Sequence, residues 1–179
     1  MTFAVAEVRV NIDSLVIRED LDSKGRRYLP KTITPFKGLV YNEYPNGQVE
    51  FEGPLESGLQ HGTWVWWYPT GEKKSEIIFS NHLKHGHGRS YFESGNLQES
   101  GSYLEDKKEG LWTQYYESDK KLSETNYKND KLDGTWKVWH EDKWGIKFKA
   151  IYKDGICLTI FVVIVPQYLT ILIPKFCIS

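Results

Sequence analysis

The chain of 179 residues is poor in the residues that define several common protein classes. It has two cysteines, Cys157 and Cys177, which are too few for a disulfide framework or a zinc ribbon. A single Met beside seven Trp argues against a helical core filled by Met and Leu. The formal net charge of -1 provides no bulk attraction for nucleic acid, so no nucleic-acid partner is predicted. Charged residues are also missing from 155–174, which sets this segment apart.

What the chain does contain is a repeat with a period of 24 residues, marked by a glycine column. These repeat-defining glycines are Gly38, Gly62, Gly86, Gly110 and Gly134. The column two positions after each Gly holds Val40, Trp64, Gly88, Trp112 and Trp136. We expect the three tryptophans of this column to be structural. Five positions after each Gly stand Glu43, Trp67, Tyr91, Tyr115 and Trp139. A constant period of this length is typical of a repeat protein whose units stack on one another.

Each unit has the alternation of a β-hairpin. In GTWVWWY (62–68), Trp64 and Trp66 alternate with Val65 and Trp67, as they would along a strand. Asn46-Gly47 predicts a two-residue hairpin turn, and similar turns follow at 70–71 and 94–95. We expect a second turn between units at the glycine column, namely at 61–62, 85–86, 109–110 and 133–134.

The predicted fold is therefore all-β, a single-layer antiparallel β-meander solenoid of 24-residue hairpins. We expect a degenerate N-terminal cap over 1–37, with strands near 7–10 and 15–18. Five hairpin repeats follow over 38–155, and the apolar tail covers 156–179.

The pattern G-x-W-x-x-Y-Y-x-x-G, followed by YKNDKLDG (127–134), resembles the bacterial MORN-type repeat. More specifically, the chain resembles the YwqK-type antitoxin family over about residues 10–155, including NIDSLVIRED (11–20) and ITPFKG (33–38). The resemblance implies an antiparallel β-meander solenoid, and the family name implies neutralisation of a partner toxin by binding. The chain departs from the pattern at Gly88, at Asp119 and Lys143, and in its tail.

Two groups of polar residues invite a chemical interpretation. His82, His85 and His87 have a spacing that would let two imidazoles meet zinc, but His85 shares its repeat column with acidic turn residues. We interpret these histidines as solvated turn residues and predict no metal site. Glu52, Glu76 and Glu124 recur in one column, which favours a structural role over acid–base catalysis. No phosphate loop or nucleophile motif is present, so we predict neither an enzyme nor a cofactor.

The aromatic column five places after each glycine suggests a binding surface. A single-layer sheet cannot bury both faces, and an aromatic stripe left accessible is typical of partner surfaces. Self-packing within the solenoid is the alternative explanation. Our hypothesis is that a protein partner contacts Trp67, Tyr91, Tyr115 and Trp139.

The two ends of the chain leave alternatives open. The opening MTFAVAEVRV has no positively charged segment, and its apolar run is too short for a signal peptide. These features favour a cytoplasmic protein. Residues 4–6 do resemble the end of such a peptide, so a start further upstream would allow secretion. The uncharged segment 156–174 is an apolar cap or strand pair, a membrane anchor, or the product of a shifted reading frame. We therefore expect a protein-binding antitoxin or, as the second class, an envelope-associated scaffold held by this tail.

Overall fold

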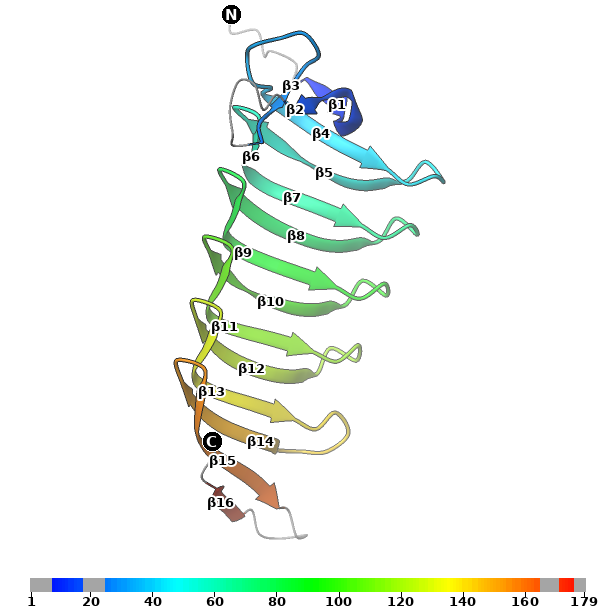
Figure 1. The fold of residues 1–179 in the computed structure, drawn as a ribbon. Coiled ribbons are helices and arrows are strands. Elements are labelled where there is room, and N and C mark those ends of the chain that lie inside the picture. The colour runs from blue at the N-terminus through cyan, green and yellow to red at the C-terminus, as the bar shows by residue number, and fades with distance from the viewer. Residues whose placement is uncertain (1–7, 18–24, 165–170, 176–179) are drawn as a thin grey trace, which may run out of the picture. The chain divides into compact units, whose positions relative to one another are not determined.

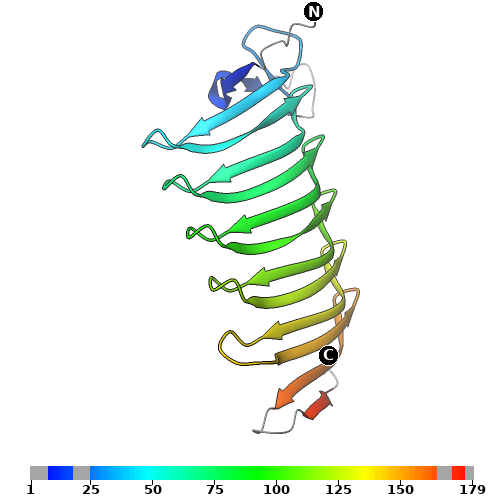
Figure 2. The same ribbon diagram turned by 180° about the vertical axis from the view of Figure 1, so that it is seen from behind.

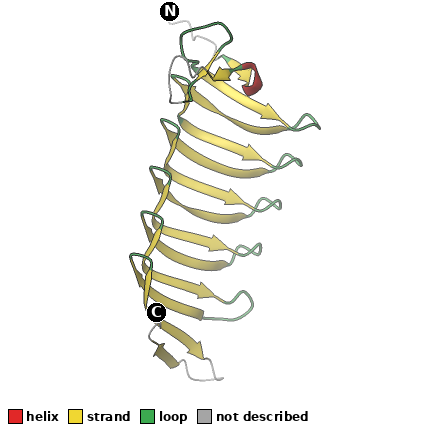
Figure 3. Ribbon diagram, viewed as in Figure 1, coloured by secondary structure: helices red, strands yellow, loops and turns green. Residues whose placement is uncertain are grey.

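The computed structural model describes residues 8–17, 25–164 and 171–175, and nearly all of their regular elements are strands (Figures 1 and 3). One 3-10 turn, η1 (Ile12–Ser14), is the only helical element among these residues. The chain divides into two compact units, Met1–His85 and Gly86–Ser179, and each is described by itself. The candidate signal-peptide end at residues 4–6 and Cys177 lie outside the described residues.

The first unit combines the cap with two long hairpins. The antiparallel order is β4 (Gly38–Glu43), β5 (Val49–Glu56), β7 (Gly62–Trp67) and β8 (Lys73–Ser80), with β6 (Leu59–Gln60) beside β5. β1 (Arg9–Asn11) pairs with β4 in parallel, so the cap departs from the meander pattern. β2 (Val16–Ile17) and β3 (Arg27–Tyr28) form a separate two-stranded sheet. β1 and β2 overlap the cap strands predicted near 7–10 and 15–18.

The second unit continues as consecutive antiparallel strands, seen from both sides in Figures 1 and 2. β9 (Leu83–Tyr91) enters this unit at Gly86 and pairs with β10 from there. The following strands are β10 (Leu97–Leu104), β11 (Lys107–Tyr115), β12 (Lys121–Lys128), β13 (Lys131–Trp139), β14 (Ile146–Lys153), β15 (Ile156–Ile164) and β16 (Ile171–Lys175). The predicted all-β fold of antiparallel hairpins is confirmed. Of the alternatives for the tail, β15 and β16 correspond to the strand pair.

The turns inside the hairpins are longer than the two residues predicted for Asn46-Gly47. Tyr44 N–H donates to the Gln48 carbonyl over 2.8 Å, and Gly47 N–H donates to the Tyr44 carbonyl over 2.9 Å. This is a turn followed by a left-handed residue, for which Gly47 has φ 83°. Asp119 replaces the glycine in a later repeat with φ 62°, so the backbone conformation survives the substitution.

The predicted position of the turns between units is wrong. The turns lie four residues earlier, where pairs of residues with positive φ join the strands: 57–58, 81–82, 105–106 and 129–130. Gly110 and Gly134 instead lie inside β11 and β13, with φ 71° and 115°, next to shifts in strand register. Gly110 and Gly134 therefore mark β-bulges, which demand positive φ just as turns do.

The core of the first unit lies between the cap and one face of the sheet. Leu15 and Phe36 from the cap join a buried cluster with Val40, Leu55, Trp64 and Phe79. Trp64 is only 2% exposed and packs in the same cluster as these cap residues. The non-repeating segment thus completes the hydrophobic core of the unit.

Candidate binding surfaces

The strand register separates an apolar face from a polar face. In the first unit Phe51, Trp64, Trp66 and Phe79 gather on the apolar face, with ring centroids 5.8–6.2 Å apart. Glu52, Val65 and Glu76 pair across neighbouring strands on the polar face. The carboxylates of the predicted Glu column all have cationic partners: Glu52 pairs with Arg9, Glu76 with Lys73, and Glu124 with Lys121. This arrangement fits the structural role predicted for the column.

Two members of the structural Trp column, Trp64 and Trp112, pack against glycines of a neighbouring strand. Trp64 lies against Gly53 and Trp112 against Gly101, and a Cβ at either glycine would overlap the indole ring. The Trp64 Nε1–H donates to the Pro54 carbonyl over 3.0 Å, and the Trp112 Nε1–H donates to the Ser102 carbonyl over 3.1 Å. Each ring is therefore fixed in position and in orientation. Trp136, further along the column, is half-buried and contacts Phe148 with a centroid distance of 5.0 Å.

In the second unit a polar network covers Trp112. Lys108 Nζ lies 3.9 Å from the Trp112 ring centroid and forms a 3.0 Å ion pair with Glu99. Gln114 Nε2–H donates to the same Glu99 carboxylate over 3.1 Å. Tyr103 packs against Trp112 with an edge contact of 4.8 Å, and burial, followed by Glu99 and Asp130, raises the pKa of its hydroxyl. Trp112 is consequently 3% exposed without any apolar cap.

The predicted partner residues stand at the ends of strands. Trp67, Tyr91, Tyr115 and Trp139 are the last residues of β7, β9, β11 and β13, and all four are half-buried. Their backbones help to join successive hairpins, since Tyr44 Oη–H donates to the Trp67 carbonyl over 2.9 Å and Tyr116 Oη–H to the Trp139 carbonyl over 3.0 Å. Their rings are thus neither fully buried in a core nor fully exposed.

Tyr115 borders an open hollow of about 680 Å³ in the second unit. Tyr116 and Phe92 contribute further aromatic rings, and three glutamates lie among the lining residues: Glu99, Glu117 and Glu141. The described residues that line the hollow include no lysine or arginine. The hollow therefore combines aromatic contact area with the carboxylates of Glu117 and Glu141, while the Glu99 carboxylate is paired with Lys108.

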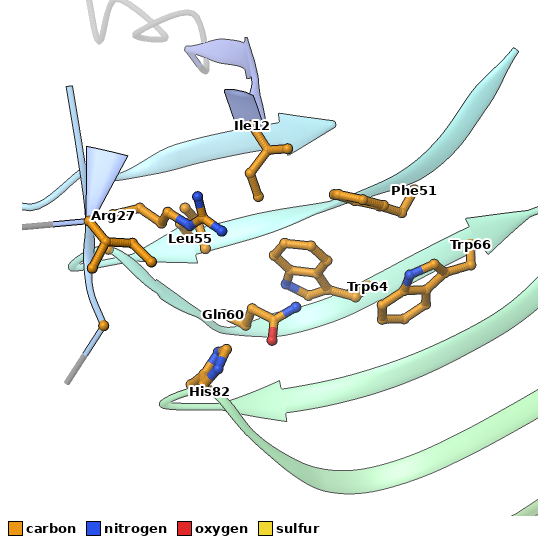
Figure 4. Close-up of a pocket in the computed structure, with 11 residues that line it drawn as sticks. Ile12, Arg27, Phe51, Leu55, Gln60, Trp64, Trp66 and His82 are labelled. Carbon is orange, nitrogen blue, oxygen red and sulfur yellow. The ribbon is translucent and has the colours of Figure 1, made fainter. Parts of the chain in front are cut away.

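A second cavity, of about 390 Å³, lies between the cap and the sheet of the first unit (Figure 4). Its apolar wall includes Phe51, Trp64 and Trp66, and its polar lining comes from Arg27, Gln60 and His82. Sequence reasoning missed this cavity, because no spacing in the sequence indicates that Arg27 from the cap meets the repeat residues.

The three histidines behave as separate exposed residues. His82 lies in the turn before β9 with φ 73°, whereas His85 and His87 belong to that strand. His87 Nδ1 lies 3.2 Å from Ser102 Oγ. Within the part of the chain that the structure describes, no group of three His, Cys, Asp or Glu side chains is placed to hold a metal ion. The same residues contain no helix long and apolar enough to cross a membrane.

Comparison with known proteins identifies the repeat. A model of the MORN repeat variant matches three consecutive segments, 60–81, 84–105 and 108–129. These segments coincide with the hairpins that carry the aromatic columns. No curated protein sequence matches the chain.

Among solved structures, the chain is similar to the one titled "Crystal structure of GtfA/B complex bound to UDP and GlcNAc", with 13% identity and a TM-score of 0.27. That match covers 70% of this chain and 26% of the other. This chain thus spans about a quarter of the length of that protein.

Proposed function

We propose that this protein is a non-enzymatic repeat protein that binds a protein partner through the hollow beside Tyr115. The supporting observation is the composition of that hollow, in which three aromatic rings accompany the carboxylates of Glu117 and Glu141. Glu99 also lines the hollow, but its carboxylate is paired with Lys108. Aromatic residues at a concave surface are typical of binding hot spots, and the carboxylates favour a partner that presents Lys or Arg. The MORN-like repeats, which form hairpin scaffolds, are consistent with such a binding role.

The specific version of this proposal is an antitoxin. It draws on the resemblance to the YwqK-type family, in which the partner is a toxin that the repeat protein neutralises by contact. The partner would then be a basic protein whose production stops growth, and production of this chain would restore growth.

A capture experiment tests the binding role. The immobilised full-length chain is exposed to an extract of the native host, and Tyr115→Ala is compared with Trp144→Ala. Trp144 is fully exposed and lies outside the hollow, so its loss controls for the removal of an aromatic side chain. We expect Tyr115→Ala to reduce the captured partner by about tenfold or more, as for the loss of a hot-spot residue, and Trp144→Ala to leave it unchanged.

Two results would contradict the proposal. Equal capture by both variants would remove Tyr115 from the interface, and unfolding of Tyr115→Ala would assign the ring to the core. Growth rescue of cells that produce the captured partner then tests the antitoxin version separately, because binding without rescue leaves only the scaffold role.

An envelope-associated scaffold is the second candidate. It is favoured by Ile156 and Leu158 on β15, which are 68% and 49% exposed. Sedimentation with lipid vesicles compares the full chain with Ile156→Ser/Leu158→Ser. Loss of vesicle binding in the double variant would support the scaffold, whereas no sedimentation of either chain would eliminate it.

A further inference from the structure

The cavity under the cap has the dimensions and the walls of a small-molecule site. Its volume of about 390 Å³ lies within the range of roughly 300–1,000 Å³ that is typical of ligand pockets. Phe51 and Trp66 flank Trp64 at centroid distances of 5.8 and 6.0 Å, so the wall is a continuous aromatic surface. The hydrogen bond from Trp64 Nε1–H to the Pro54 carbonyl holds the central ring in place. Such a wall suits a flat apolar ligand.

The polar side chains that line the cavity are not engaged by other side chains of the described residues. Figure 4 shows the Arg27 side chain extending toward the aromatic residues, with Gln60 and His82 on the same cavity. Among the described residues, no side chain forms a hydrogen bond or ion pair with the side chains of Arg27, Gln60 or His82. Arg27 and Gln60 are half-buried and His82 is exposed, so all three have donors that a ligand in the cavity could meet.

The positive charge of Arg27 in the lining favours an anionic ligand. Arg27 is the only charged residue among the described residues that line the cavity, and none of these residues is acidic. A guanidinium binds a carboxylate through two parallel hydrogen bonds, which a neutral ligand cannot reproduce with the same strength. Gln60 offers an amide N–H to the same ligand group.

We propose that the cavity between the cap and the sheet binds a small aromatic carboxylate, whose ring packs on Trp64 and Trp66 and whose carboxylate pairs with Arg27. This site is separate from the hollow beside Tyr115. It is assembled by residues of the first unit alone, and its existence does not depend on the proposed protein partner.

Three probes of one shape test the proposal with the full-length chain. Isothermal titration measures the binding of 2-naphthoate, of its neutral analogue 2-naphthamide, and of the cation 2-naphthylmethylammonium. We expect 2-naphthoate to bind about tenfold more tightly than 2-naphthamide, as a charge-assisted pair provides, and the cation to bind least. Chemical shifts of the Trp64 indole N–H report whether the ring of the probe enters the cavity.

Charge variants assign the effect to Arg27. Arg27→Gln should abolish the preference for 2-naphthoate over 2-naphthamide, and Arg27→Glu should reverse it in favour of the cation. The matched control is Arg89→Gln, which removes one positive charge from an exposed position on β9 in the second unit. This control should retain the full preference, and thermal unfolding of each variant verifies that the cap remains folded.

The proposal is overturned by any of three results. They are an absence of binding by all probes at millimolar concentration, equal affinity for 2-naphthoate and 2-naphthamide, and an unchanged preference in folded Arg27→Gln. If Arg27→Gln does not fold, Gln60→Glu supplies the test, because a carboxylate placed in the cavity should weaken 2-naphthoate binding and leave 2-naphthamide binding nearly unchanged.

Discussion

Trp64 in the first unit and Trp112 in the second hold the same place in the 24-residue repeat, but different chemistry covers their rings. Each ring lies against a glycine and donates its indole N–H to a backbone carbonyl. Trp64 is then buried in a cluster with apolar cap residues, whereas Trp112 is buried beneath Lys108 and its partner Glu99.

The repeat therefore fixes the glycine and the carbonyl that each of these two tryptophans contacts. The residues that shield the ring from water differ between the two units. A glycine and a carbonyl acceptor are set by local register, and the chain provides both at Gly53 for Trp64 and at Gly101 for Trp112.

The residues that shield each ring from water come from other segments. Around Trp64 they include the apolar cap residues Leu15 and Phe36, whereas over Trp112 they include Lys108. A Lys side chain can do this because its aliphatic stem buries apolar surface while its charge stays near water.

Replacement of the two rings gives the largest expected effect. Trp64→Ala should lower the free energy of unfolding by about 3–5 kcal/mol, because the cap core would be left with a cavity. Trp112→Ala should cost on the order of 1 kcal/mol less, since the site beneath Lys108 can relax and admit water. Urea unfolding at neutral pH measures both, with fully exposed Trp144→Ala as the control. Equal costs at the two positions would show that the covers are energetically equivalent.

Substitution of the glycines beneath the two tryptophans gives the next largest loss in the free energy of unfolding. Gly53→Ala and Gly101→Ala should each destabilise by about 1–3 kcal/mol, because the new methyl group would overlap an indole ring. The overlap also predicts coupling, so Gly101→Ala should cost much less in the Trp112→Ala background. A double-mutant cycle in urea checks this. Additive costs would mean that Gly101 is required for a reason other than its contact with the Trp112 ring.

The Lys108 cover gives a smaller effect. Lys108→Ala should cost about 1 kcal/mol, the scale of a partly desolvated cation–π contact. Lys108→Met retains most of the covering stem, so it should be less destabilising than Lys108→Ala. Urea unfolding and the exposure of Trp112 to an aqueous quencher measure the cover. Equal losses for Met and Ala would indicate that the charge of Lys108, rather than its stem, provides the stability.

The sequence was sufficient to predict the features that recur. Alternation around Trp64 predicts the strands, and the constant period predicts that Trp64 and Trp112 share a role. The glycine column misled because positive φ is needed in turns and in bulges alike, so Gly110 carries the same signal in either place. The turns themselves use pairs such as Glu105 and Asp106, which carry no glycine.

Features that occur once were beyond prediction. The cavity under the cap depends on Arg27, which no repeat column contains, and on the packing of segments distant in sequence. The position of Lys108 over Trp112 likewise depends on a long side chain that spans strands. The hypothesis on Tyr115 and its column remains a prediction, because half-buried rings fit both a partner surface and self-packing.

The smallest effect concerns the column immediately before the repeat glycines, in which the first unit has His61 and the second has Asp133. The Asp133 carboxylate accepts a 2.8 Å hydrogen bond from Lys153 Nζ and a longer one from Asp154 N–H. Lys153 is the main reason that the pKa of Asp133 lies below the ordinary value of 3.8. A depressed carboxylate pKa stabilises the fold above the ordinary value, and this stability is lost as pH falls through the lower pKa of the folded state.

Asp133→Asn should therefore unfold at a slightly lower urea concentration than the unmodified chain near pH 5, and this difference should shrink as the pH falls from 4 to 2. The difference should be small, because the pair is exposed to solvent and screened. His61→Asn provides the comparison in the first unit: it leaves every carboxylate in place, so its effect should be constant between pH 2 and 4. A constant gap for Asp133→Asn as well would show that the ion pair with Lys153 contributes no acid-dependent stability, and the two positions would then be equivalent despite their different side chains.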